Sequence, residues 1–118
     1  MVRRGSFIAA ALLLLAGCQP DAPPAKPLTP DESAALRPGD ARIAGLYDQA
    51  CRSCHTVADT GAPLTGDRGL WDARWTKGEA ELLNSTIRGL GGMPAGGQCF
   101  ACSPEDYRAL IRFMAGRA

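Results

Sequence analysis

The C-terminal end of the chain has the clearest helical pattern of apolar and polar positions. Four apolar residues recur there at i, i+3, i+4 and i+7, and they are Tyr107, Leu110, Ile111 and Met114. Ser103 stands where an N-cap is expected, and Pro104 occupies the first helical position. Asp106 follows the serine by three residues and approximates a capping box. The pattern predicts a helix that begins after Ser103 and buries its apolar stripe.

Two further segments have helical spacing. One covers residues 79–88, opens near Thr76 or Gly78 and ends at Gly89; its buried residues are expected to be Leu82, Leu83 and Ile87. The other begins at about Asp40 and leads into the first cysteine pair, with an apolar face formed by Ile43, Leu46, Tyr47 and Ala50. No alternating run is long enough to predict a strand. The sequence therefore predicts an all-α fold of three to four helices joined by long loops.

The first residues have the pattern of an export signal. A basic start, Met1 to Arg4, precedes an apolar run from Phe7 to Ala16 that is too short to span a bilayer core of about 30 Å. The run ends in Leu-Ala-Gly-Cys, which resembles the lipobox of bacterial lipoproteins. We expect residues 1–17 to be a lipoprotein signal peptide and Cys18 to be the lipidated residue. The alternative is an ordinary signal peptide with an incidental cysteine.

Proline dominates the stretch that follows Cys18. Six of the nine prolines lie between residues 20 and 38, and such a composition favours extended polyproline II conformations over a packed core. We expect residues 18–39 to form a lipid-anchored tether and residues 40–118 to form one domain. A domain of this size is marginally stable without a staple, a metal or a cofactor.

The charge balance excludes one class of partner. Removal of residues 1–17 takes away Arg3 and Arg4, so 13 basic side chains become 11 against 12 acidic ones, a net charge of −1. Nucleic-acid binding requires a dense basic face, which this composition does not offer. The lipid anchor expected at Cys18 would make a membrane one partner.

The remaining four cysteines form two Cys-x-x-Cys pairs, Cys51/Cys54 and Cys99/Cys102. Two such pairs could ligate zinc, but 44 residues lie between them, more than zinc modules usually have. An oxidising compartment also competes with zinc for thiolates. A thioredoxin-like role for the first pair would need a strand–helix unit that the sequence does not predict.

Covalent haem attachment accounts for the histidine that the other interpretations leave unused. The first pair is followed at once by His55, the chain's only histidine, in the sequence Cys-Arg-Ser-Cys-His. Cys-x-x-Cys-His is the attachment signature of c-type haem. Two thiols on one helical turn can reach the two vinyl groups, and the adjacent imidazole then lies beneath the iron.

Met93 is the candidate for the second axial ligand. It lies in a loop with five glycines, at positions 89, 91, 92, 96 and 97, and is followed by Pro94. Glycine allows the backbone to approach a flat ligand closely. A methionine that merely packs is more often found on a helix face, as Met114 is.

With these motifs the chain resembles a class I monohaem cytochrome c of the bacterial cytochrome c5 type, over residues 40–118. The resemblance is carried by Tyr47 before "CRSCH" and by the segments "GAPLTGD" at 61–67, "WDAR" at 71–74 and "GGMPAGGQCFAC" at 91–102, together with the "SPEDY" helix start. It implies a small all-α fold whose long loops wrap one haem c.

The resemblance also implies roles for individual residues. Thioether bonds would form at Cys51 and Cys54, with His55 and Met93 as the iron ligands. Pro63 matches the proline whose carbonyl receives the histidine N–H. Two residues that match positions enclosing the haem and its propionates are Trp71 and Arg74, and the pair that matches the family's disulfide is Cys99 and Cys102. One departure is Ile43, which stands where a small residue often lies at the crossing of the first and last helices.

An iron held on both sides has no open position, so the resemblance implies a single-electron carrier, not an enzyme. We expect it to work between membrane redox protein partners, without a small-molecule substrate, on the periplasmic side of a bacterial membrane. The alternatives are a haem-based gas sensor with a labile Met93 and a haem subunit of a larger oxidoreductase complex.

Overall fold

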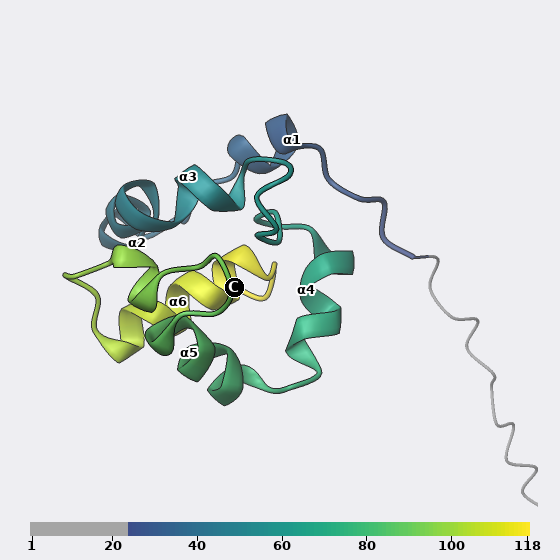
Figure 1. The fold of residues 1–118 in the computed structure, drawn as a ribbon. Helices are drawn as coiled ribbons and strands as arrows, with labels where there is room; N and C mark the ends of the chain where they lie inside the picture. The colour runs from purple at the N-terminus through teal and green to yellow at the C-terminus, as the bar shows by residue number, and fades with distance from the viewer. Residues whose placement is uncertain (1–23) are drawn as a thin grey trace, which may run out of the picture.

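The computed structural model describes residues 24–118, which contain six α-helical segments and no strand (Figure 1). Their bounds are α1 Pro30–Ala34, α2 Ala41–Leu46, α3 Arg52–His55, α4 Arg68–Trp75, α5 Glu79–Arg88 and α6 Pro104–Met114, with a π turn at Tyr47–Cys51 and a 3-10 turn at Ala95–Gln98. The predicted all-α class is confirmed. The predicted signal peptide and Cys18 lie outside the described residues. No helix in the described part is long and apolar enough to cross a membrane.

Helix α6 is the centre of the core, between α2 and α5 (Figure 1). It begins as predicted: Ser103 is the N-cap, Pro104 follows it, and Asp106 completes a capping box with the serine. The buried residues of its stripe are Leu110, Ile111 and Met114. The i, i+3, i+4 spacing alone was sufficient to place this helix and its buried face.

Helix α2 leads into the cysteine pair through a π turn. The predicted apolar face is confirmed, since Leu46 and Tyr47 are buried and Ile43 and Ala50 pack against the core. The regular helix that we expected is interrupted at Tyr47–Cys51, where the wider turn changes the direction of the side chains that follow. Such single π turns occur frequently at functional sites.

Helix α5 has the predicted bounds, with Gly78 before its first residue and Gly89 after its last. Leu83 is buried and Leu82 is half-buried, but Ile87 is 43% exposed, so the prediction that Ile87 is buried is wrong. The helix is only ten residues long and faces the core with one narrow stripe, so the residue at the stripe's edge near the C-terminus remains in solvent.

Helix α4 was not predicted. The Asp67 side chain caps it by accepting a hydrogen bond from the backbone N–H of Leu70, and of the helix residues only Trp71 is buried. With one buried position in eight residues there is no apolar repeat to detect, and the helix depends on its cap and on the anchoring of Trp71.

The proline-rich stretch is not wholly extended, so that part of the prediction is wrong. Residues 30–34 form α1, whose N-cap Thr29 makes a capping box with Glu32. Ser33 is fully buried against the domain. Pro30 occupies the first position of this helix. Proline is favoured there as well as in polyproline II, so the composition of the stretch did not distinguish the two conformations.

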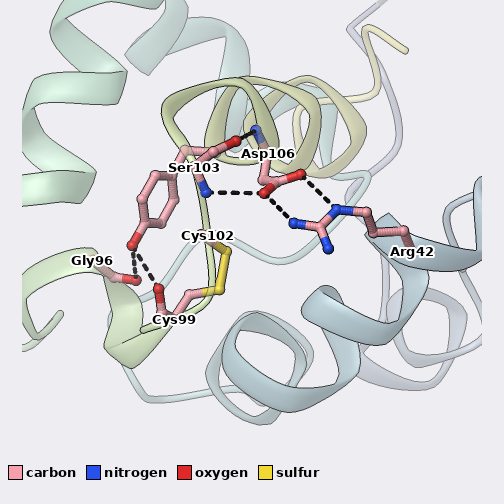
Figure 2. Close-up of a disulfide and its surroundings, with 7 residues drawn as sticks. Arg42, Gly96, Cys99, Cys102, Ser103 and Asp106 are labelled. Carbon is pink, nitrogen blue, oxygen red and sulfur yellow. Dashed lines mark hydrogen bonds and ion pairs between the residues drawn. A yellow bond between two sulfur atoms is a disulfide. The ribbon is translucent and has the colours of Figure 1, made fainter.

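An ion pair joins α2 to the start of α6 (Figure 2). Arg42 Nη2 lies 2.8 Å from Asp106 Oδ2, and its Nε lies 3.3 Å from Oδ1. The same carboxylate accepts a hydrogen bond from the backbone N–H of Ser103. The hydrogen bonds from Arg42 and then from Ser103 lower the pKa of Asp106 from 3.8 to about 2.

Acid should therefore weaken the fold through Asp106. A carboxyl group whose pKa is lowered in the folded state stabilises that state above its unfolded pKa and loses this contribution as the pH falls. We expect the stability advantage of the native chain over Asp106→Asn to be full above about pH 4 and to disappear towards about pH 2. Thermal unfolding followed by circular dichroism across this range tests it. Glu105→Gln, an exposed neighbour on the same turn, is the control, and an advantage that stays constant with pH would contradict the prediction.

Candidate functional site

One cavity of about 380 Å³ brings together the residues that the sequence singled out. Its lining includes Cys51, Cys54, His55, Pro63, Trp71, Arg74 and Met93. These residues come from the end of the π turn, from α3, from the loop that follows it, from α4 and from the glycine-rich loop after α5. Cys99 and Cys102 are not among the lining residues. The candidate haem-binding residues named from the sequence therefore line a single cavity, and the second cysteine pair lies outside it.

The imidazole of His55 is buried and fixed in one orientation. Its Nδ1 lies 2.8 Å from the carbonyl oxygen of Pro63. Burial lowers the pKa of His55, the Pro63 hydrogen bond opposes this, and the positive charge of Arg74 adds to the lowering. A neutral ring donates its Nδ1–H to the carbonyl and keeps the Nε2 lone pair available for a metal ion.

Single hydrogen bonds shape the loop between His55 and α4. The backbone N–H of Thr65 donates to the His55 carbonyl at 2.7 Å. The indole N–H of Trp71 donates to the Leu64 carbonyl at 2.9 Å, and the indole ring stacks on the imidazole with centroids 5.9 Å apart. Trp71 thus holds both the loop and the ring plane of His55.

Arg74 is half-buried at the cavity wall, one turn after Trp71. Its Nη1 donates to the Leu70 carbonyl at 2.7 Å, which directs the guanidinium along its own helix. The remaining N–H groups of the guanidinium are suited to a carboxylate at the cavity edge.

Met93 lines the cavity from the glycine-rich loop. Residues Leu90 and Met93 exchange two backbone hydrogen bonds, each of 3.0 Å, which close a tight turn. At Gly89 a Cβ atom would lie 2.9 Å from the Met93 carbonyl oxygen, and at Gly97 it would lie 3.3 Å from the Met93 methyl carbon. Side chains at these two glycines would displace the methionine, so the glycines define its position.

The two cysteine pairs differ in chemical state. Within the described part of the chain, Cys51 and Cys54 carry free thiols, while Cys99 and Cys102 form a disulfide (Figure 2). Burial raises the pKa of Cys51 to about 11, so its thiol is protonated at neutral pH. Residues 24–118 contain no group of three or more His, Cys, Asp or Glu side chains that could hold a metal ion.

Tyr107 is a site residue that the sequence did not single out. Its hydroxyl lies 3.2 Å from the carbonyl oxygen of Gly96 and 3.0 Å from that of Cys99, and the residue lines the cavity. In the sequence it appears only as the first member of the apolar stripe of α6. Its hydroxyl ties the glycine-rich loop to that helix.

The donor set fits a covalently attached haem. Two free thiols, an imidazole with Nε2 available and a thioether line the same largely apolar cavity. Thiols, imidazole and thioether are the groups that hold c-type haem and its iron. No other pair of described cysteines offers free thiols beside an imidazole.

A family model described as "Cytochrome C oxidase, cbb3-type, subunit III" matches residues 38–114. Cytochrome c5 of Azotobacter vinelandii is 37% identical over 68 residues, which cover 56% of this chain and 82% of that protein. Cytochrome c-555 of Chlorobaculum thiosulfatiphilum is 36% identical over 76 residues, or 61% of this chain and 88% of that protein. Cytochrome c-555 of Prosthecochloris aestuarii is 34% identical over 55 residues, or 47% of this chain and 56% of that protein.

Replacement of Trp71 should loosen the loop that orients His55. Trp71→Phe keeps an aromatic ring but removes one of the two N–H donors to the buried Leu64 carbonyl, the other being the backbone N–H of Asp67, and it leaves unfilled space where the larger indole was buried. We therefore expect a loss of about 1–3 kcal/mol in the free energy of unfolding. Trp75→Phe is the matched control, because that indole is half-buried under Arg117 and should lose less than about 1 kcal/mol. Guanidinium unfolding curves measure both, and equal losses would show that Trp71 has no special role in the loop.

Proposed function

The chain belongs to the class I monohaem cytochromes c, electron-transfer proteins with one haem c, here attached through Cys51 and Cys54, and we propose that His55 and Met93 are the two axial ligands of its iron. The observation that carries the proposal is that both side chains line one cavity, with His55 held by its Nδ1 so that Nε2 remains available. The haem supplies an iron that gains and loses single electrons.

The protein's own residues keep this site closed. The glycine-rich loop holds Met93 in the cavity, and Tyr107 ties that loop to α6 through the Gly96 and Cys99 carbonyls. Trp71 stacks on His55 and excludes water from that side. A buried iron with a methionine ligand favours the reduced state and so has a raised potential. With both axial positions taken, the site favours electron transfer over catalysis or gas binding.

A second candidate is supported by the matching family description. That description names a subunit of an oxidase, so the same electron-transfer chemistry would operate inside a fixed complex. The two candidates share the ligands and differ in the partner, which would be bound permanently in one case and transiently in the other.

We further propose that the protein is exported and held on the periplasmic side of a membrane by lipid on Cys18, where it exchanges electrons with redox proteins. The signal-like residues 1–17 and the Leu-Ala-Gly-Cys sequence support this. Since residues from Leu28 onward contact the domain, the connection from Cys18 to Pro27 has ten residues and a maximum length of about 35 Å. This reach is shorter than a free tether of residues 18–39 would give.

Replacement of Met93 should leave one axial position of the iron without its protein ligand. In a host with haem-attachment machinery, we expect Met93→Ala to keep its haem but to lose the weak far-red sulfur-to-iron absorption band of the oxidised form. Met114→Leu is the matched control, because Met114 is a buried residue of α6 and leucine has a similar volume. The control should keep the band. A native protein with haem but without the band would contradict ligation by Met93 and favour the gas sensor.

Replacement of Cys18 should abolish lipidation. We expect fatty acid to label the native protein but not Cys18→Ser, because the lipid is attached at Cys18. Haem content of the variant should be unchanged, because Cys18 is not part of the proposed haem site. Fatty-acid label that persists without Cys18 would refute the lipid anchor but leave the haem ligands untouched.

A further inference from the structure

The segment from Leu28 to Arg37, here called the strap, lies against the loop that orients His55. It precedes the residues matched by the family model, which begin at residue 38. Its one fully buried side chain is Ser33, whose exposed fraction is 0%. The hydroxyl of Ser33 lies 2.9 Å from the Thr65 carbonyl oxygen and 3.3 Å from the His55 carbonyl oxygen. A polar side chain this deeply buried is held by the backbone of the histidine itself.

Contacts on both sides of Ser33 fix the strap in place. Before it, the backbone N–H of Leu28 donates to Asp67 Oδ2 at 3.1 Å, the carboxylate that also caps α4. After it, the side chain of Leu36 packs directly over Gly66, where a Cβ atom would clash with it. With the bond from Ser33 to Thr65, the strap thus contacts each of the three residues 65–67.

Arg52, in the haem-attachment segment, adds a further contact with the strap. Its Nη2 donates to the Ala34 carbonyl oxygen at 3.3 Å. Arg37 of the strap also pairs, at 3.2 Å, with Asp48 in the π turn. The strap therefore joins the helical segment that carries the two thiols to the loop that carries Pro63.

Thr65 connects the strap to the imidazole. It is fully buried, its N–H donates to the His55 carbonyl at 2.7 Å, and its hydroxyl accepts a hydrogen bond from Tyr47 at 2.9 Å. Pro63, whose carbonyl receives the imidazole N–H, lies two residues before it. The position of the Thr65 backbone therefore sets the position of the Pro63 carbonyl.

We propose that Ser33 is a positioning residue for His55: its hydroxyl holds the Thr65 and His55 carbonyls together and so keeps the Pro63 carbonyl in line with the imidazole Nδ1–H. This inference rests on the proposed function, in which His55 binds the iron. A strong hydrogen bond at Nδ1 makes the imidazole a better donor to the metal, which stabilises the oxidised iron. Loss of Ser33 weakens that bond and raises the potential.

The test uses the full-length, haem-loaded protein with Ser33→Ala. In the reduced form, nuclear magnetic resonance measures the exchange of the His55 Nδ1–H with solvent, and a redox titration measures the potential. We expect exchange about tenfold faster than in the native protein, because two buried carbonyls lose a donor, together with a higher potential. Amide exchange in α6 should be unchanged.

Glu32→Gln is the matched control. Glu32 is exposed, caps α1 through Thr29 and makes no contact with the His55 loop, so both quantities should stay at their native values. Leu36→Ala is a second strap variant, which loosens the contact with Gly66 and should shift both quantities in the same direction as Ser33→Ala.

Unchanged Nδ1–H exchange and potential in both Ser33→Ala and Leu36→Ala would overturn the proposal and leave the strap as a packing segment. An equal effect of Glu32→Gln would also overturn it, because general stability of α1 would then be the cause. Failure of the proposed function has a different signature: it appears in the native protein, as haem that shows no imidazole bound to iron.

Discussion

The hydrogen bond between the imidazole of His55 and the Pro63 carbonyl is the constraint on which the rest of the site depends. The loop that supplies the carbonyl has no regular secondary structure, so individual donors must fix it. The indole N–H of Trp71 donates to the Leu64 carbonyl, and the backbone N–H of Thr65 donates to the His55 carbonyl. The N–H of Gly66 donates to the Met114 carbonyl, at the end of α6, at 2.7 Å. Three consecutive residues of the loop are thus bonded to three different elements, α4, α3 and α6, which fixes the path of an irregular segment.

The two walls of the cavity obtain their rigidity in different ways. On the histidine side, buried donors fix carbonyl groups, and the carbonyls of His55 and Leu64 each accept from two donors. On the methionine side, the backbone is held by close approach at Gly89 and Gly97 and by the Tyr107 hydroxyl. The disulfide then joins the end of this loop to the start of α6, where the Arg42–Asp106 pair also meets (Figure 2). Helix α6 consequently supports both walls.

The parts of the fold that could be predicted from the sequence are those encoded by neighbouring residues. The capping box of Ser103 and Asp106 and the glycines around α5 are local signals, and the structure has them where they were expected. Helix α4 has one buried residue and no repeat, so nothing local distinguishes it from a loop. In the strap, composition was misleading because a proline at the first position of a helix looks the same as one in an extended chain.

The same distinction separates the ligands from the residues that support them. The thiols and the imidazole lie within five consecutive residues, so their chemistry is visible as a motif, whereas Ser33 reaches Thr65 across 32 positions and leaves no pattern. The family match begins after the strap, and within the matched residues the bond from the Thr65 N–H to the His55 carbonyl closes the histidine loop without this serine. The strap therefore acts on a loop that is already closed. The strap therefore affects the strength of the hydrogen bond at His55 Nδ1, while attachment of the haem depends on the Cys-x-x-Cys-His motif itself.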